Sequence, residues 1–298
     1  MKPHRLTVVA FAAVMTGAGV AQRQEPTFKV AVDLVSVDVL ISASGRPVAG
    51  LTRANFEVFD NGVRQRVDAV GEGALQPSET IKAQAVPLDV IFVFDTSESM
   101  TGERIQYLAQ AAHGVLERLR PVDRVALITF SDRTVLRIAF TQDLGVVGTS
   151  VDQMVADGRT SLLDALYAAL TLRRAETRRC VILVFTDGRD NASWLGGQDV
   201  LQVACESDVV IYGVGLGDAA SGDLAAFVEN TGGDLIMAKT AQQLKDLFVR
   251  VIGEMQARYI LTYYPKGVKR EGWHSIEVKL TGAKGDVKAR RGYWVRAD

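Results

Sequence analysis

The chain is 298 residues long, with 48% hydrophobic and 23% charged residues and a formal net charge of -1. This composition is typical of a globular protein with a sizeable core and argues against global disorder. The near-zero net charge gives no overall field that would attract nucleic acid or an anionic membrane, so we expect neither as a partner.

The charge is nevertheless uneven along the chain. From Arg258 onward, ten Lys and Arg residues stand against four Asp and Glu residues. We favour a solvated face on alternating strands as the explanation. A basic docking surface is the alternative.

Residues 1–21 have the pattern of an export signal. Lys2 and Arg5 precede an apolar run of small residues, and the segment ends in Gly19-Val20-Ala21, with small residues at the cleavage positions. No other stretch approaches the length needed to span a bilayer. We therefore predict an exported protein, periplasmic or extracellular, with no stable transmembrane segment in the mature chain; an uncleaved anchor is the alternative.

Residues 28–70 read as an N-terminal β segment. Within it, Asn61-Gly62 lies between two strand-like runs, which predicts a tight hairpin because both central positions need positive φ. Residues 71–87 are polar, lack periodicity and are interpreted as a linker.

Residues 88–257 alternate between continuous apolar runs and amphipathic stretches. This alternation predicts an α/β fold, a doubly wound and mostly parallel Rossmann-like sheet with helices on both faces. Strands are expected at 88–94, 124–130, 134–140, 180–186, 208–214 and 233–237. Helices are expected at 104–119, 162–172, 199–206, 224–230 and 241–255.

Residues 258–298 return to short strand-like runs. We expect this C-terminal β segment to pair with residues 28–70 and to form one small β-sandwich-like domain, with the α/β domain inserted in it. Two independent β units are the alternative.

Oxygen-bearing side chains follow two of the buried runs and one Gly-containing loop. Asp95, Ser97 and Ser99 come after the run 90–94, Asp187 comes after the run 181–185, and Thr160 follows Gly158-Arg159. In an open parallel sheet, ligands gather at the carboxyl ends of strands where the strand order reverses. Short hydroxyl and carboxylate side chains that converge there suit a hard divalent cation.

These motifs together resemble the metal-ion-dependent adhesion site of von Willebrand factor A domains. The resemblance covers residues 86–257, and the flanks GRPVAGLTRANFEVFDNG and YILTYYP resemble bacterial secreted proteins related to these domains. It implies hydroxyl ligation by Ser97, Ser99 and Thr160, with Asp95 and Asp187 acting directly or through water. The oxygen-only set favours Mg²⁺, with Mn²⁺ or Ca²⁺ as alternatives.

The resemblance also implies that an acidic side chain of a protein or surface ligand completes the metal shell. Four further residues are candidates for contact with that ligand. Arg159 either steers an acidic group or points to solvent, and Trp194 either anchors a partner or packs under its loop. For Glu98 and Asp190 the ordinary explanation is a role at a helix start or turn.

We expect a binding module and no enzymatic activity, because the chain lacks a GxSxG motif, a P-loop and a histidine placed to activate Ser97 or Ser99. The alternatives are a metal-dependent hydrolase that uses Asp95 and a structural scaffold of an envelope complex. Cys180 and Cys205 are either a disulfide or two buried free thiols.

Overall fold

The computed structural model describes residues 34–72, 86–173, 178–187, 189–216, 222–238 and 241–296. The predicted export signal, residues 28–33, most of the predicted linker and Gly188 lie outside these residues. Every described residue belongs to one compact unit that begins at Asp33.

A six-stranded sheet in the order β11-β10-β9-β6-β7-β8 forms the centre of the α/β domain, which we define as residues 86–257. Neighbouring strands run parallel, except β7 and β8, which are antiparallel. The expected α/β fold with a mostly parallel sheet is therefore confirmed. Its strands are Leu88–Asp95 (β6), Arg124–Phe130 (β7), Thr134–Thr141 (β8), Arg179–Thr186 (β9), Val210–Leu216 (β10) and Leu235–Ala238 (β11).

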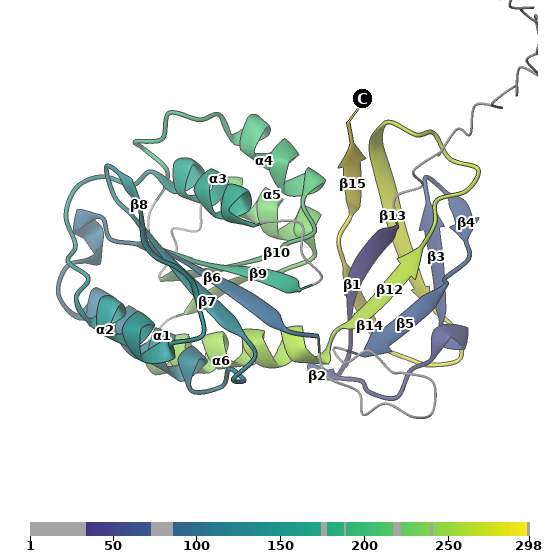
Figure 1. Ribbon diagram of the computed structural model, residues 1–298, viewed down its shortest axis with the longest axis horizontal. Coiled ribbons are helices and arrows are strands. Elements are labelled where there is room, and N and C mark those ends of the chain that lie inside the picture. Colours follow the sequence, from purple (N-terminus) through teal and green to yellow (C-terminus); the bar gives the residue numbers. More distant parts are fainter. Residues whose placement is uncertain are drawn as a thin grey trace, which may run out of the picture. The chain divides into compact units, whose positions relative to one another are not determined.

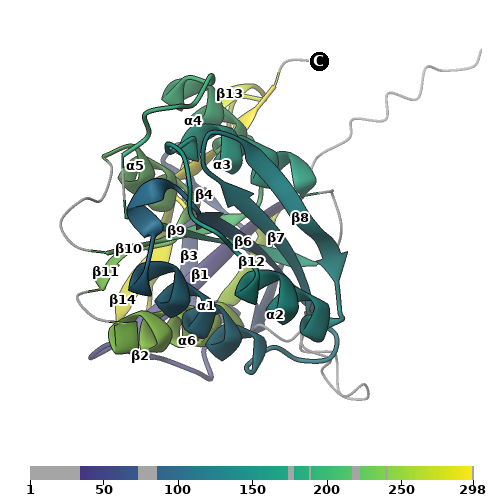
Figure 2. The same ribbon diagram turned by 90° about the vertical axis from the view of Figure 1, so that its left-hand side faces the viewer.

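Helices cover both faces of this sheet (Figures 1 and 2). Phe92 and Phe94 of β6 pack in the core on one face, whereas Ile91 and Val93 pack in the core on the other. Every residue of β6 is buried, because alternate side chains meet helices on opposite sides. One face carries α1 (Glu103–Leu116), α2 (Leu144–Asp152) and α6 (Ala241–Ala257); the other carries α3 (Leu162–Leu172), α4 (Gly197–Glu206) and α5 (Gly222–Thr231).

Helix α2 was not among the helices expected from the sequence. Its nine residues include two glycines and three valines, which are weak helix formers. The Asp143 side chain caps the helix by accepting a hydrogen bond from the Val146 N–H at 3.2 Å, and Val147 and Val151 are buried in the core. Tertiary packing and one cap thus outweigh local propensity here.

Strands from both ends of the described chain pair with each other in what we call the β region, residues 34–72 and 258–296. One sheet has the order β14-β1-β12-β5 with β2 beside β1, and the other has the order β15-β13-β3-β4. In Figure 1 the purple and blue strands of the first segment therefore alternate with the yellow strands of the second in the first sheet, and in the second sheet yellow β13 lies beside blue β3. The strands are Val35–Ala43 (β1), Arg46–Pro47 (β2), Phe56–Asp60 (β3), Val63–Gln65 (β4), Ala69–Glu72 (β5), Tyr259–Tyr263 (β12), Gly272–Leu280 (β13), Asp286–Ala289 (β14) and Gly292–Val295 (β15).

The predicted hairpin at Asn61-Gly62 is confirmed. Both residues have positive φ, 47° and 78°, and Asp60 pairs with Val63 across the two-residue turn. This turn sets the register in which β3 pairs with β4.

A buried arginine at the junction of α6 and β12 joins the β region to the α/β domain. The Arg258 side chain is fully buried, and its guanidinium donates hydrogen bonds to the Tyr212 hydroxyl (2.9 Å) and to the Gly232 carbonyl. Arg179 of β9 makes an ion pair with Asp38 of β1. Each of these two arginines has its partner in the other part of the molecule, so their contacts connect the β region to the α/β domain.

Candidate functional site

The proposed site lies where the order of the central sheet reverses. The chain adds β7 and β8 on one side of β6 and then returns to place β9 on the other. Asp95 ends β6, and Asp187 directly follows β9. Because β6 and β9 are parallel neighbours, both carboxylates lie at the same edge, where ligands of open α/β sheets gather.

The Asp95 carboxylate is held by the loop that follows β6 and by the end of the neighbouring strand β9. Its Oδ1 accepts a hydrogen bond from the Ser97 N–H at 2.8 Å, and its Oδ2 accepts one from the Thr186 hydroxyl at 2.6 Å. The first contact turns the backbone after β6, and the second fixes the carboxylate against β9. Thr186 precedes Asp187 in the sequence but was not among the ligands expected from it.

A chain of hydroxyl contacts connects the loop after β6 to Asp187, which follows β9. The Ser97 and Ser99 hydroxyls lie 3.1 Å apart, and the Ser99 hydroxyl donates to Asp187 Oδ1 at 2.6 Å. Three side chains expected to act together are therefore in direct contact, and Asp95 adjoins them through Ser97.

Hydrogen bonds hold the Thr160 loop against the loop after β6 and against the loop after β9. Gly158 O accepts from Glu98 N at 2.9 Å, and Thr160 N donates to Asn191 Oδ1 at 2.9 Å. Gly158 has φ of +82°, and a Cβ there would come within 2.5 Å of the Asp132 carboxylate, so this position requires glycine. Thr160 is buried, and its hydroxyl makes no hydrogen bond with a described residue.

Arg104 also reaches the site, although the sequence analysis did not single it out. Its guanidinium makes an ion pair with Asp187 Oδ2 and donates to the Ser99 carbonyl at 3.1 Å. Arg104 stands in the first turn of α1, where the helix dipole disfavours a cation. That unfavourable placement was the available signal that a carboxylate lies nearby.

The four ligand-contact candidates differ in their surroundings. The exposed Arg159 side chain pairs with Asp132 at 2.7 Å, and the Trp194 side chain is 94% exposed. Asp190 accepts hydrogen bonds from Leu163 N and from Ser193, the helix-start role that is ordinary for such a residue. Glu98 is exposed in the short 3-10 helix Glu98–Met100.

The electrostatics of the site favour a bound cation. Burial raises the pKa of Asp95 above its ordinary value of 3.8, the hydrogen bonds from Ser97 and Thr186 lower it, and the charge of Asp187 raises it further. An ionised Asp95 beside Asp187 is thus under-neutralised. Among the described residues, no group of three or more His, Cys, Asp or Glu side chains is placed to hold a metal. The oxygens that meet at this edge belong to two carboxylates, Asp95 and Asp187, and to the hydroxyls of Ser97, Ser99 and Thr186. Hydroxyl and carboxylate donors fit a hard divalent ion.

The cysteine pair does not form a disulfide. Cys180 and Cys205 are both free and buried. Cys180 belongs to the core between the sheet and α3 to α5, whereas Cys205 is in the last turn of α4, where its carbonyl accepts a hydrogen bond from Arg290. Burial raises the pKa of both thiols, which keeps them protonated and unreactive. Of the two alternatives, the structure has the free thiols.

Comparison with known proteins gives matches in sequence and in fold. The model of the von Willebrand factor type A domain matches residues 89–250. The uncharacterised protein sll0103 of Synechocystis sp. is 25% identical over 61% of this chain and 46% of its own length. Bovine inter-alpha-trypsin inhibitor heavy chain H4 is 29% identical over 35% of this chain and 13% of its own length. The chain thus spans less than half the length of these relatives.

Two solved structures share the fold. A von Willebrand factor type A protein from Catenulispora acidiphila superposes with a TM-score of 0.52 at 14% identity and covers 80% of this chain and 74% of its own. Proximal thread matrix protein 1 from the mussel byssus, described with a zinc-occupied MIDAS motif, has a TM-score of 0.51 at 18% identity and covers 62% and 48%. Over the described part of this chain, every helix is too short or too polar to cross a bilayer.

Proposed function

Because the chain belongs to the von Willebrand factor type A domain family, we propose that it is an exported, divalent-metal-dependent binding module for a protein or surface ligand. The observation that carries this proposal is the set of contacts that joins the carboxyl ends of β6 and β9 at the sheet edge: Thr186 to Asp95, and Ser97 through Ser99 to Asp187.

The residues that would hold the ion are Asp95, Ser97, Ser99, Thr160 and Asp187. The oxygen-only donor set favours Mg²⁺, with Mn²⁺ or Ca²⁺ as alternatives. Zinc in the MIDAS motif of the mussel protein is a precedent for a divalent ion in this fold. When bound, the ion offers a coordination position that an acidic side chain of the partner can fill.

The ligand would meet a second anchor in Trp194. Its backbone N–H and that of Leu195 donate to the Asp164 carboxylate at 3.1 to 3.2 Å, so the loop is held against α3 while the indole is exposed. Tryptophan is enriched among the few residues that dominate binding energy at protein interfaces. We propose that the partner offers a carboxylate to the metal and an apolar pocket to Trp194.

We further propose that the module is not an enzyme. Both oxygens of Asp95 already accept hydrogen bonds, which opposes its use as a nucleophile. The two described histidines face other partners, His113 to Asp152 and His274 to Asp60. The site therefore has carboxylates and hydroxyls to ligate an ion, and neither described histidine lies beside Ser97 or Ser99.

Titration with MgCl₂ and MnCl₂ by calorimetry tests the metal proposal. We expect one site in the wild type and none in Thr160→Val, which keeps the shape of the side chain and removes the hydroxyl. Thr171→Val is the matched control, because Thr171 also loses a hydroxyl but lies on α3, where it bonds only its own helix. An isotherm in Thr160→Val equal to that of the wild type would contradict the assignment.

Capture from envelope extract with and without EDTA tests the binding proposal. We expect partners that are lost in EDTA and in Trp194→Ala. Partners that persist in EDTA would favour the scaffold instead, and turnover of ester or phosphate substrates that depends on Asp95 would favour the hydrolase.

A further inference from the structure

Two helices of the α/β domain end against the β region, which supplies partners for the carbonyls at their ends. The Arg290 guanidinium, between β14 and β15, donates to Ser207 O at 2.8 Å and to Cys205 O at 2.9 Å at the end of α4. The Arg258 guanidinium donates to Gly232 O, which directly follows α5. Because the carbonyls at the end of a helix have no partner within it, the β region completes both helices from outside.

The hydrogen-bond acceptors of both guanidinium groups are uncharged oxygens. Arg258 is fully buried, and Arg290 is 8% exposed. Besides the helix ends, Arg258 donates to the Tyr212 hydroxyl at 2.9 Å and Arg290 donates to Gly292 O at 2.7 Å. A buried cation is costly without a compensating partner, and the C-terminal end of a helix carries partial negative charge that compensates it. The two cations of the β region therefore depend in part on the ends of α4 and α5.

The backbone after α5 also packs directly on the backbone between β14 and β15. Gly232 has φ of +79°, and a Cβ there would come within 2.5 Å of Arg290 N and 2.7 Å of the Ala289 carbonyl carbon. Even the methyl group of an alanine has no room, so this position requires glycine. Protein interiors that are packed this closely transmit a displacement to the neighbouring atoms. A movement of one part at this contact therefore displaces the other.

Ion pairs surround this contact, and in each of them the base belongs to the β region and the acid to the α/β domain. They are Lys288 with Asp234 (2.6 Å), Arg291 with Glu229 (3.0 Å) and Arg296 with Glu206 (2.5 Å). Exposed pairs contribute little one by one. Together with Arg258 and Arg290, however, these residues make up five of the ten Lys and Arg residues from Arg258 onward. Half of the basic residues of this segment thus have a partner in the α/β domain.

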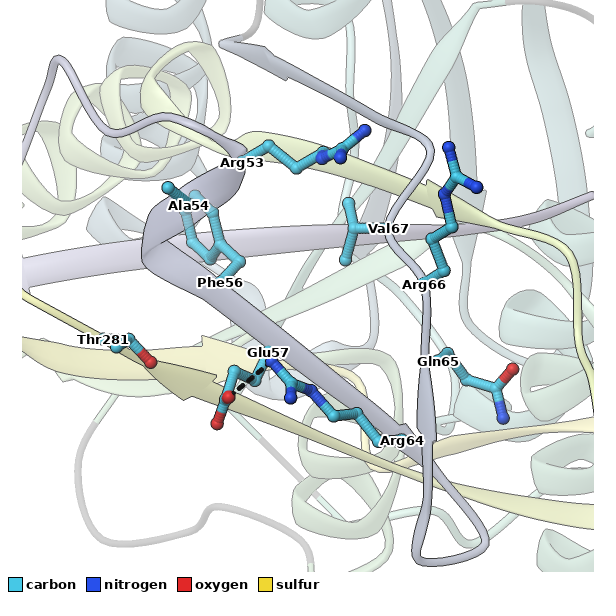
Figure 3. A pocket seen from close by; sticks show the side chains of 9 residues that line it. All are labelled: Arg53, Ala54, Phe56, Glu57, Arg64, Gln65, Arg66, Val67 and Thr281. Atoms are coloured by element: carbon cyan, nitrogen blue, oxygen red, sulfur yellow. Dashed lines mark ion pairs between the residues drawn. The ribbon is translucent and has the colours of Figure 1, made fainter.

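Arg64 differs from these residues, because its partner lies within the β region. It pairs with Glu57 at 2.7 Å, beside a cavity whose lining residues all belong to the β region (Figure 3). Glu57 belongs to β3 and Arg64 to β4, so the pair connects neighbouring strands of one sheet. It is a reference for an ion pair that does not cross the boundary.

We infer that the α/β domain and the β region unfold as one cooperative unit, and that an ion bound at the metal site consequently stabilises the β region as well. Opening of the α/β domain alone would take the acceptors from Arg258 and Arg290, and opening of the β region alone would take the caps from α4 and α5. A ligand that binds only the folded state stabilises everything that unfolds together with its site. The effect of the ion rests on the proposed function, whereas the shared unfolding does not.

Hydrogen exchange of the full chain in EDTA, followed by mass spectrometry, tests the shared unfolding. Ile41→Val removes one methylene from the core of the β region, at a position of β1 that pairs with Val287 of β14. The slowest amides exchange through global unfolding, so we expect those of β6 and β9 to exchange about fivefold faster, as do those of β1 and β12. Faster exchange in β1 and β12 alone would overturn the inference. Val63→Ala, which removes apolar atoms from an exposed position of β4, is the control and should change neither part.

Arg290→Gln tests whether the boundary contacts carry the coupling. The variant keeps a donor but removes the buried cation from the end of α4, so the slowest amides of both β6 and β12 should exchange about tenfold faster in EDTA. Arg64→Gln is the matched control, because the same substitution there breaks an ion pair inside the β region, and its effect should stay below about fivefold. Equal effects of the two variants would overturn the inference, as would a change confined to one part in Arg290→Gln.

MgCl₂ added to the wild type tests the effect of the ion. At a concentration one hundred times the Kd, the slowest amides of both β6 and β12 should exchange about one hundredfold more slowly. Slower exchange in β6 but not in β12 would overturn the inference and leave the proposed metal site intact. Unchanged exchange in both strands would contradict the metal site and with it the effect of the ion, whereas the two series in EDTA decide the shared unfolding separately.

Discussion

Strand β6 carries one buried aspartate near each end, and the two are neutralised in different ways. Asp89, near the amino end, accepts hydrogen bonds from Arg124 at 2.7 and 3.0 Å and from Arg178 at 2.6 Å. Asp95, at the carboxyl end, accepts from uncharged donors, the Ser97 N–H and the Thr186 hydroxyl, and makes no ion pair with a described residue. One end of the strand is closed by fixed cations, and the other is surrounded by neutral donors.

The pKa values of buried carboxylates at the two edges follow this difference. Burial alone would raise the pKa of Asp123, beside the amino end, but hydrogen bonds from Arg120 and from the Leu88 N–H hold it below its ordinary value. Burial raises the pKa of Asp95, and its neutral partners do not reverse the effect. At the amino end of β6 the buried carboxylates are thus neutralised by arginines, whereas at the carboxyl end the ionised form of Asp95 would be stabilised by an added cation.

The largest expected effect is at the closed end. Asp89→Ala leaves Arg124 and Arg178 without their buried partner and should lower the free energy of unfolding by about 3 kcal/mol. The loss should be the same in EDTA and in excess MgCl₂, as measured by urea unfolding. A loss that depends on metal would contradict the division of roles between the two ends.

The corresponding change at the open end should act mainly through the metal. Asp95→Asn keeps the size of the side chain but removes a buried charge, so in EDTA its free energy of unfolding should equal or exceed that of the wild type. At a metal concentration one hundred times the Kd, the wild type should gain about 2.7 kcal/mol and the variant nothing. Equal gains in urea unfolding would show that the ion binds elsewhere.

Acidity should affect the metal-free wild type in a defined direction. Because the pKa of Asp95 is raised in the folded protein, protonation stabilises the folded state. That contribution is fully present below the ordinary value of 3.8 and is lost as the pH rises through the raised pKa. Metal affinity should change in the opposite sense and fall as the pH drops through the same range, since the ion binds the ionised carboxylate.

Urea unfolding in EDTA over a pH series checks the first expectation, and calorimetric titration with MgCl₂ checks the second. Asp95→Asn is the control for the unfolding series, because it removes the titrating group. If the pH dependence of unfolding in Asp95→Asn matches that of the wild type, another group is responsible.

The smallest expected effect concerns Arg104, the cation that pairs with Asp187 at the open end. Arg104 pairs with Asp187 from a half-exposed position, and such pairs contribute about 0 to 1 kcal/mol to stability. Arg104→Gln should therefore lower metal-free stability only slightly and raise metal affinity about fivefold, because a competing positive charge is removed. Arg118→Gln changes the net charge equally without contact to Asp187, so an equal rise there would exclude a specific role for Arg104.

Much of the α/β domain could be predicted from the sequence because its strands are continuous apolar runs. The expected strand 88–94 is Leu88–Asp95, and the expected strand 124–130 is Arg124–Phe130. Helix α2 could not be predicted in the same way, since an aspartate cap and packing hold a segment of weak helix formers. Local pattern predicts elements whose stability is local or periodic, and it misses those that depend on their neighbours.

The same distinction applies to the site. Asp95, Ser97 and Ser99 are close in sequence and follow a strand, so their motif is visible. Arg104 contacts Asp187, which is 83 residues away in the sequence, and the residues around Arg104 do not indicate which carboxylate it pairs with. The exposure of Trp194 depends on how Asp164 holds its loop, and the separation of Cys180 from Cys205 depends on the packing of α4.

The pairing of strands from both ends of the described chain has a mechanical consequence. β1, near the first described residue, pairs antiparallel with β12 and β14, and β15, near the last, pairs with β13. Tension applied between these ends therefore loads the strand ladders of the β region first. The α/β domain is joined to the β region at 86 and 257 and through the contacts of Arg258 with Tyr212 and of Arg179 with Asp38, so a pull on the strands reaches the ligand-facing loops only across these junctions.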